Sequence, residues 1–499
     1  MAEAGRLLDC AGQGELDLGL RLPQVHASMV GQAKPRTLFD LDKPRRRRLV
    51  SGPRVLKTTS DLLFDVLVDV YGQLGFDAIG DEVFRDLVVA RIVEPTSLED
   101  VGRVLGEFGR SAASVRTLHR TLKRCHDGRY RGQLAEICFD HAVANGDVAL
   151  VLYDVTTLRT FAEKEDDFRK VGYSKIRSVD PQVVVGLLVD RFGFPLEIGC
   201  FEGNKAEKLT MLEIIGQYQG RHQIENMIVV GDAGMLSAAN LAALDEARCF
   251  FIVGSRMTKA PIDLESHFHW HGDAFTDGQI IDTVTPRIGK NTDNSTSLRA
   301  EPVWTPDTHQ GSWRAIWAFS RKRYARDNRT LTAQLGRAQA VIAGEKAART
   351  PRFVKATKSG LALDQAALDR ARRLAGLKGW VTNIPATLMP AAEIMSNYHD
   401  LWHVEQSFRI SKSDLNATPL FARKRDAIEA HLTIVFTALA ISRTIQNQTG
   451  LSIRAFLRTL RPLRSATIQV NGIIQAFPPE IPSDVTATLK RLQTGQARH

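Results

Sequence analysis

The chain has 499 residues, of which 43% are hydrophobic and 24% charged, and it carries a net charge of +10 with a pI near 9.4. This length is too great for one compact core, so we expect roughly two to four domains, and the composition is ordinary for a soluble globular protein. The positive balance favours an anionic partner, of which nucleic acid is the commonest.

The cysteines and the apolar pattern exclude several classes of protein. Five scattered cysteines without CxxC spacing argue against a zinc module and against a disulfide framework. The opening residues, MAEAGRLLDC, lack the apolar region of a secretory signal, and no window holds 18 uninterrupted apolar residues. We therefore expect a cytoplasmic protein with no membrane partner.

Residues 1–58 are weakly patterned and predict a basic N-terminal arm. The arm ends in the charge run KPRRRRLVSGPR, which contains Arg45, Arg46, Arg47 and Arg48. Four consecutive arginines can contact a DNA backbone, or they can form a solvated basic linker, and the sequence leaves both interpretations open.

Residues 59–146 predict a helical region. Amphipathic segments at 61–76 and 81–95 precede two shorter helical segments, of which the second is basic. Such a pair resembles a helix-turn-helix, although plain helical bundles contain such pairs too. On the DNA-binding interpretation, the contacts come from Arg116, Arg120, Lys123 and Arg124.

An α/β region is expected over residues 147–256. Its first segments predict three strands, two of them joined by the turn DRFGFP, and the whole order is β-β-β-α-β-α-β. Three opening strands that can pair as neighbours, followed by this alternation, predict a mixed sheet with helices on its faces.

The alternation stops beyond this region. Residues 257–376 predict a β-rich plus helical insertion, and the α/β pattern returns over 377–449. That second part contains a strand and then two strong helices, at 391–415 and 425–450. Residues 450–499 are a C-terminal tail.

Three acids stand at chemically suggestive places. Asp154 lies inside or near the end of the first core strand, Asp232 ends the fourth, and Glu405 lies on the helix at 391–415. A carboxylate that ends a buried strand is costly without a charged partner, and sites in open α/β sheets gather beyond the carboxyl ends of strands. Each acid also has a local explanation, namely a turn for the two aspartates and an i+4 pair with Arg409 for the glutamate.

Carboxylates from separate segments suit hard divalent cations. Mg²⁺ prefers oxygen ligands, and two such ions about 4 Å apart can activate an attacking oxygen and stabilise the leaving oxygen of a phosphodiester. The helix at 391–415 supports this interpretation, because Trp402, Glu405, Arg409 and Lys412 share one of its faces. Arg409 and Lys412 could then hold phosphate oxygens beside the metals.

With these residues together, the chain resembles the Asp-Asp-Glu transposases of bacterial insertion sequences, in the group marked by Y-(2)-R-(3)-E-(6)-K. Tyr398, Glu405 and Lys412 occupy three of the four positions, and Leu401 stands where the group has Arg. The segments YDVTTL and VVGDAGM resemble the two Asp motifs of the family, with Ala233 where a basic residue is often seen.

The resemblance implies an RNase H-like catalytic core interrupted by an insertion. It implies metal-dependent cleavage at the ends of an insertion sequence and strand transfer into target DNA. Asp154, Asp232 and Glu405 would be the catalytic metal ligands for two Mg²⁺ ions, with Mn²⁺ able to substitute, and Tyr398 and Lys412 would contact the DNA end. The implied partners are double-stranded DNA, as terminal inverted repeats and as target, and a second copy in a homodimer on paired ends. The implied location is the bacterial cytoplasm, in association with the nucleoid.

The insertion holds three tryptophans and three histidines of interest. In relatives such an insert can hold a flipped base by stacking it on an aromatic ring. Tryptophans on strands are more often core residues, and both interpretations are open for Trp304, Trp313 and Trp317. The segment SHFHWHGD has histidines at alternate positions, which on a strand would share a face and could bind zinc, or could form a polar strand edge or loop. These are His267, His269 and His271.

Two other functions remain open from the sequence. A catalytically inactive, transposase-derived DNA-binding regulator would use only the N-terminal helices and the basic patches. A phosphotransferase is suggested by YDVTT, which is similar to the D-x-D-x-T nucleophile loop of haloacid-dehalogenase-like phosphatases, but Thr156 stands in place of the second Asp of that loop.

Overall fold

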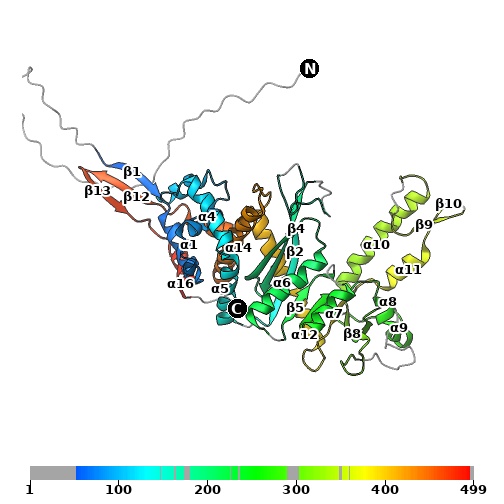
Figure 1. The fold of residues 1–499 in the computed structure, drawn as a ribbon. Coiled ribbons are helices and arrows are strands. Elements are labelled where there is room, and N and C mark those ends of the chain that lie inside the picture. Colours follow the sequence, from blue (N-terminus) through cyan, green and yellow to red (C-terminus); the bar gives the residue numbers. More distant parts are fainter. Residues whose placement is uncertain are drawn as a thin grey trace, which may run out of the picture. The chain divides into compact units, whose positions relative to one another are not determined.

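The protein is organised around one eight-stranded mixed sheet (Figure 1). The computed structural model describes residues 52–146, 148–161, 164–172, 180–224, 226–233, 237–288, 303–347, 351–358 and 360–494. The predicted DNA-backbone contact of the N-terminal arm lies outside these residues; it comprises Arg45, Arg46, Arg47 and Arg48.

The strands of the sheet run in the order β4-β3-β2-β5-β6-β11-β8-β7. They are β2 (Leu150–Arg159), β3 (Gln182–Asp190), β4 (Pro195–Glu202), β5 (Ile228–Gly231), β6 (Phe250–Gly254), β7 (Ile280–Pro286), β8 (Ser312–Phe319) and β11 (Leu377–Thr382). The first three pair antiparallel, and β2, β5 and β6 pair in parallel. Helix α6 (Glu207–His222) follows β4, and α7 (Ala238–Glu246) follows β5. The mixed, RNase H-like sheet that the sequence predicts is confirmed.

Helix α6 closes one face of the sheet. Successive strand residues point to opposite faces, and the hydroxyl of Tyr153 on β2 lies 2.8 Å from Thr210 Oγ1 on α6. A Cβ atom at Gly186 of β3 would lie 2.5 Å from both Ile214 Cδ1 and the Tyr153 hydroxyl, so the glycine leaves room for these two side chains between α6 and the sheet. Asp154, the next residue of β2, therefore points to the other face.

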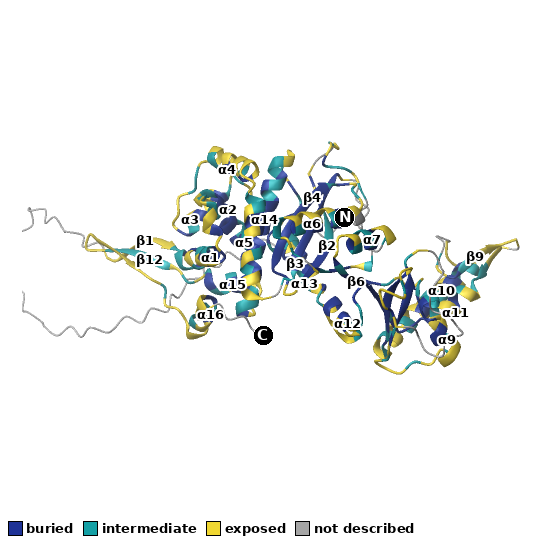
Figure 2. Ribbon diagram, turned by 60° about the horizontal axis from the view of Figure 1, so that its bottom comes forward, coloured by how far each residue is buried: buried dark blue, intermediate teal, exposed yellow. Residues whose placement is uncertain are grey.

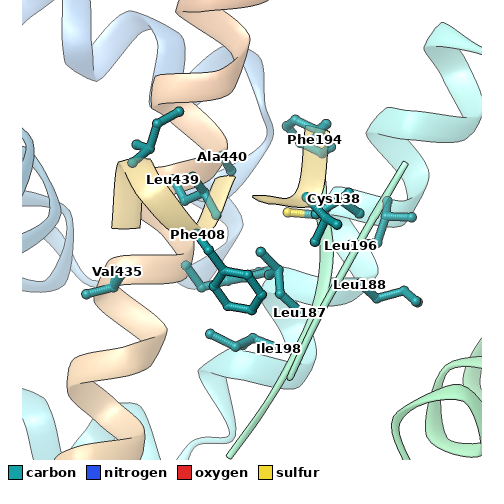
Figure 3. Packing of buried hydrophobic residues seen from close by; sticks show 14 of the residues in the cluster. Cys138, Leu187, Leu188, Phe194, Leu196, Ile198, Phe408, Val435, Leu439 and Ala440 are labelled. Atoms are coloured by element: carbon teal, nitrogen blue, oxygen red, sulfur yellow. The ribbon is translucent and has the colours of Figure 1, made fainter. Parts of the chain in front are cut away.

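The other face carries α13 (Trp402–Arg409) and α14 (Arg425–Thr449). Phe408 of α13 is 8% exposed and packs among apolar side chains that include Leu187 of β3 and Leu439 of α14 (Figure 3). Burial of such a ring stabilises a fold by about 1.5–3 kcal/mol, so this contact fixes α13 on the sheet.

The helices predicted over 59–146 are present and pack on α14. They are α1 (Asp61–Gln73), the 3-10 turn η2 (Phe76–Ile79), α2 (Glu82–Val93), α3 (Val101–Glu107), α4 (Val115–Asp127) and α5 (Tyr130–Asn145). Helix α14 contacts α1, α2, α4 and α5 as well as β4. By length and composition α14 could cross a membrane, yet 89% of its most apolar window is buried inside the protein, as in a core helix.

Two strands from the predicted insertion belong to the main sheet. β8 pairs with β11 and β7 pairs with β8, both antiparallel. The remaining elements of this region are α8 (Ala260–Asp263), α9 (Glu265–His271), α10 (Arg321–Ile342), β9 (Val354–Thr357), β10 (Gly360–Leu363) and α11 (Gln365–Arg373). Residues from Pro53 onward cluster as a single unit, so the domain boundaries expected at 146, 256, 376 and 449 stay predictions.

A buried arginine ties these strands to the segment that leads into α12 (Ala391–His399). Arg314 of β8 is fully buried, and its guanidinium contacts Asp282 of β7 at 2.6 Å. It also donates to the carbonyl oxygens of Ile384 and Met389 at 3.0 and 2.7 Å. The position of α12 therefore depends on a satisfied buried charge.

The continuous helix predicted over 391–415 is wrong, because the chain turns between α12 and α13. Beyond α13 it continues as a π-helical turn, η4 (Ile410–Asp414), in which the N–H of Leu415 donates to the carbonyl of Ile410 at 2.9 Å. A π turn adds a residue to the helical repeat, so Lys412 does not follow the α-helical spacing that the sequence predicts.

A second, three-stranded sheet escaped the sequence analysis. It consists of β1 (Arg54–Thr59), β12 (Ser465–Val470) and β13 (Ile473–Phe477) in that order, and α15 (Ile453–Leu460) and α16 (Ser483–Thr494) flank its C-terminal hairpin. Figure 2 shows that β1 is exposed for most of its length. Pairing between segments about four hundred residues apart leaves no local sequence signal.

Replacing Phe408 by alanine should destabilise the protein by about 3–5 kcal/mol, because it leaves a cavity between α13, the sheet and α14. Chemical denaturation followed by far-UV circular dichroism measures this loss. Trp402→Ala, on the same helix but 51% exposed, is the matched control and should change stability far less. Equal effects of the two substitutions would contradict the packing described here.

Candidate active site

The pairing of β2 with β5 brings two of the predicted site residues together. The parallel register runs up to Leu152 on β2 and Val230 on β5. Asp154 and Asp232 each follow two residues after this last pair. Because neighbouring strands lie about 4.8 Å apart, the two aspartates are neighbours across the sheet. Asp154 is within β2 and half-buried, whereas Asp232 directly follows β5 and is exposed.

The same row continues across the next two strands. Gly231 of β5 pairs with Val253 of β6, so Asp232 and Gly254 come next in register. Gly254 in turn pairs with Trp380 of β11. The row therefore holds two carboxylates, a glycine and an indole on neighbouring strands.

Tyr398 of α12 covers the glycine in this row. A Cβ atom at Gly254 would lie 2.6 Å from the Tyr398 hydroxyl, so only glycine leaves room for the ring. The hydroxyl donates to Asp232 Oδ1 at 3.4 Å. Burial raises the pKa of Tyr398 above its ordinary value, and the negative charges of Asp232 and Glu405 raise it further. Tyr398 thus stays protonated and helps to orient the Asp232 carboxylate.

Glu405 reaches this face of the sheet from α13, which packs on β2 and β3. Its side chain is exposed. Within the described part of the chain it forms no side-chain hydrogen bond and no ion pair, so the i+4 pair with Arg409 that the sequence allows is not made. A carboxylate without a cationic partner on a helix beside Asp154 is available for a cation.

The position of α13 is set by a second buried arginine, Arg443 of α14, which is 1% exposed. Its guanidinium donates to Gln406 Oε1 of α13 at 2.6 Å and to the carbonyl of Phe192 in the β3–β4 turn. The hydroxyl of Ser407 donates to the carbonyl of Gly193 in that turn at 2.9 Å. Burial lowers the pKa of Arg443 to about 10, which leaves it charged at neutral pH. Glu405 therefore lies on a helix whose neighbouring residues Gln406 and Ser407 are hydrogen-bonded to α14 and to the β3–β4 turn.

The donor set has the chemistry that a hard divalent cation needs, but it is not preassembled. Asp154 Oδ1 accepts the N–H of Val155 at 2.8 Å, and Asp232 Oδ1 accepts the N–H of Ala233 at 2.7 Å. No group of three His, Cys, Asp or Glu side chains among the described residues is arranged to hold a metal ion. Asp154 and Asp232 lie on adjacent segments of the sheet, and Glu405 lies on a helix that packs on β2.

The three other residues of the predicted face of α13 differ in their exposure and surroundings. Trp402 and Arg409 are exposed, and Lys412 is partly exposed on the π turn. Lys412 lines a small cavity together with Thr156, which lies two residues beyond Asp154 on the same face of β2. The charged end of α13 therefore lies along β2 as expected, although a π turn rather than an α-helix carries Lys412.

Leu401 has a structural explanation for its departure from the signature. It is 7% exposed and forms part of the main apolar core at the start of α13. An arginine here would place its aliphatic stem among apolar side chains. Its charge would also be buried there unless the side chain extended to solvent. Leu401 is thus a packing residue.

Two basic residues that the sequence analysis missed, Lys378 and Arg323, lie beside this row of site residues. Lys378 of β11 is half-buried, with Nζ 4.6 Å from the ring centre of Tyr398. Burial lowers the pKa of Lys378, Arg323 lowers it further, and Asp232 acts in the opposite direction. Nothing local distinguishes Lys378 from any strand lysine, because its proximity to Asp232 follows from the order of strands in the sheet.

The basic residues of α4 present an exposed face, with two of them engaged in ion pairs. Arg116 and Arg120 are exposed. Lys123 pairs with Asp127 at 2.8 Å, and Arg124 pairs with the N-cap Asp81 of α2, also at 2.8 Å. Seven residues, 108–114, separate α3 from α4, whereas a helix-turn-helix has a turn of about 3–4 residues.

The tryptophans proposed for base stacking are core residues, which corrects that expectation. Trp304, Trp313 and Trp317 are 2%, 2% and 0% exposed. The indole N–H groups of Trp304 and Trp317 donate to Ser312 O and Asp263 Oδ2 at 2.9 and 3.1 Å. A ring without an exposed face offers no platform to a base.

The histidine segment is helical, so the three side chains do not share a face: His267 and His271 lie on one face with ring centres 5.1 Å apart, and His269 lies on another. His267, His269 and His271 lie on α9, where His267 is buried and stacks on Phe275. The absence of a three-residue metal group among the described residues also removes the support for zinc.

Substituting Leu401→Arg should lower the unfolding temperature by several degrees, because an arginine displaces apolar packing at the start of α13. Trp402→Arg, at the neighbouring exposed position, should be tolerated. Thermal unfolding of the two variants decides this. A Leu401→Arg variant as stable as the parent would show that the new side chain reaches solvent and that Leu401 is not a packing residue.

Comparisons with known proteins identify the family of the chain. Residues 148–441, more than half of the chain, match the family model described as Transposase DDE domain. Among curated proteins no sequence matches the chain. A solved structure of the piggyBac transposase, a synaptic complex with hairpin DNA, is similar over 82% of this chain and 81% of that chain, with 10% identity and a TM-score of 0.38. By the family match, which spans the paired strands of both aspartates and the helix of Glu405, the chain belongs to the transposase DDE domain family.

Proposed function

We propose that this transposase cleaves DNA at the ends of an insertion sequence and transfers the freed strand into target DNA, using divalent metal ions held by Asp154, Asp232 and Glu405. The observation that carries the proposal is the register of β2 and β5, which makes the two aspartates neighbours on the face that α13 covers. Mg²⁺ is the proposed ion, with two bound and Mn²⁺ able to substitute.

The roles of the side chains follow from their contacts. Bound divalent cations would supply activation of the attacking oxygen and stabilisation of the leaving oxygen of a phosphodiester. Asp154, Asp232 and Glu405 would hold these ions. The pairing of β2 with β5 supports this role for the two aspartates, and the packing of α13 on β2 supports it for Glu405. Tyr398 would act as a positioning residue, since its hydroxyl bonds to Asp232 and its ring is only 9% exposed.

The cations of α13 and η4 would bind the DNA end. Arg409 is exposed, and Lys412 lies beside Thr156 on the face that carries Asp154. Both would place a positive charge near a phosphate held at the carboxylates. Together with Tyr398 and Glu405, Lys412 supports membership of the Y-R-E-K group, in which Leu401 departs from the signature.

Double-stranded DNA, as terminal inverted repeats and as target, is the proposed partner, with a homodimer on paired ends. Helix α4 would contribute to end binding through its exposed Arg116 and Arg120. Lys123 and Arg124 are held by Asp127 and Asp81, so they would contribute less.

Loss of a single carboxylate should abolish cleavage. With Mg²⁺ or Mn²⁺ and plasmid DNA carrying the element's terminal repeats, Asp232→Asn should lower the nicking rate by more than about 100-fold, because second-shell changes alone cost up to that factor. Glu393→Gln, an exposed acid on α12, is the control and should nick at the parental rate. Tight end binding with no nicking by the parental protein would instead support the inactive DNA-binding regulator.

Neutralising the exposed arginines of α4 should weaken DNA binding. Arg116→Gln combined with Arg120→Gln should reduce the steepness of the log affinity against log salt plot by about 1 for each phosphate that is no longer bound. Fluorescence anisotropy over a potassium chloride series measures this slope. Arg458→Gln with Lys490→Gln, exposed on α15 and α16, removes the same charge and should leave the slope unchanged; identical slopes for both double variants would remove α4 from the interface.

A further inference from the structure

A cationic cleft opens where the row of site residues continues beyond Asp232. Its volume is about 610 Å³, and it lies between the end of β8, the first turns of α10, β11 and α12. Its basic lining comprises Lys322, Arg323, Arg326, Arg329 and Lys378, with Trp380 also lining it. None of these residues stands out in the sequence, because they come from two segments that the fold brings together.

The positive charge of the cleft is largely uncompensated. Of its five Lys and Arg side chains, only Arg326 pairs with a carboxylate within 4 Å in the described part of the chain, at 3.8 Å from Asp327. One acid, Asp277, lies at the rim, where its Oδ1 accepts the N–H of Arg321 at the start of α10. Like charges held together without acids are costly unless an anion joins them.

An unsatisfied donor provides a second, independent sign of a ligand. The indole Nε1 of Trp380 is buried and has no hydrogen-bond partner among the described residues. The Trp380 side chain as a whole is 2% exposed and lines the cleft. A buried N–H without an acceptor costs about 1–3 kcal/mol. Every polar group that argues for a ligand here is a donor, so the ligand they fit carries acceptor oxygens and negative charge.

The cleft lies in line with the candidate active site. Trp380 of β11 pairs with Gly254 of β6, which is next in register to Asp232. Two strand spacings of about 4.8 Å separate the carboxylate from the indole, a distance of roughly 10 Å. Lys378 bridges the two places, with Nζ 4.6 Å from the Tyr398 ring and 5.2 Å from the Trp380 ring.

We propose that this cleft binds backbone phosphates of the DNA strand on one side of the cleavage point, and so continues the DNA track from Asp232 onto α10. One strand of B-form DNA carries a phosphate about every 3.4 Å along the helix axis, so a phosphate at the carboxylates and another roughly 10 Å away beside Lys378 can belong to the same strand. Arg323 and Lys322 would neutralise the backbone, and a rotation of the Trp380 indole toward the cleft would let its buried Nε1 donate to a phosphate oxygen. The location of the cut rests on the proposed function, whereas DNA binding in the cleft does not.

The test uses full-length protein and a fluorescein-labelled duplex of mixed sequence in EDTA, where no cleavage occurs. The double variant Lys322→Gln, Arg323→Gln is compared with Arg370→Gln, Arg372→Gln, which removes two exposed charges from α11. The cleft variant should weaken binding severalfold and flatten the salt dependence by about 1 for each phosphate released, while the control should match the parent. Circular dichroism verifies that both variants are folded.

Two outcomes would overturn the cleft assignment. Equally weakened binding in the cleft variant and the α11 control would mean that only overall charge matters. If inorganic phosphate competed with the labelled duplex as effectively, per phosphate group, as unlabelled duplex does, the cleft would be a site for small anions. The proposed function is tested separately. If the parental protein fails to nick DNA that carries the element ends in the presence of Mn²⁺, the proposed cleavage activity is wrong. If the cleft variant still flattens the salt dependence of binding in that case, the assignment of the cleft as a DNA-binding site stands.

Discussion

The arrangement of the candidate site depends on the parallel pairing of β2 with β5. That pairing is in register up to Leu152 and Val230, and it makes Asp154 and Asp232 neighbours although seventy-eight residues separate them in the chain. A shift by one residue would turn Asp154 toward α6, on the opposite face of the sheet. The register is held by burial, since nearly every residue of the neighbouring β3 is buried, and by the close approach of α6 over Gly186. Burial of apolar strands thus determines where the charges meet.

Helix α13 brings the third carboxylate to the same face, and both apolar and polar contacts fix it. Phe408 fills the space between the sheet and α14, and Arg443 of α14 joins α13 to the β3–β4 turn. Burying an arginine is costly, and the Nε of Arg443 has no hydrogen-bond partner among the described residues. Arg443 therefore specifies one position of the helix through its two terminal nitrogens rather than adding much stability. Glu405 itself remains exposed, as a group that must meet a ligand has to be.

The sequence was sufficient for elements whose signal is local, and insufficient where partners are distant. Apolar runs ending in acids identify β2 and β5 and hence Asp154 and Asp232, and the amphipathic pattern around Glu405 identifies α13. The turn at Leu401 and the π turn at Lys412 could not be read, because tertiary packing overrides helical spacing there. Three tryptophans suggested an exposed platform, but their burial depends on β7 and β8 joining the main sheet. The contribution of Lys378 likewise requires knowing that β11 lies between β6 and β8.

The central claim is that Asp154, Asp232 and Glu405 together hold divalent cations, and Mn²⁺ binding tests it most directly. Electron paramagnetic resonance of free Mn²⁺ counts the ions that the full-length protein removes from solution in the presence of duplex DNA. We predict that the parental protein binds Mn²⁺ and that Asp154→Asn, Asp232→Asn and Glu405→Gln each lose most of this binding, whereas Glu393→Gln binds as the parent does. Unchanged Mn²⁺ binding in all three carboxylate variants would contradict this claim.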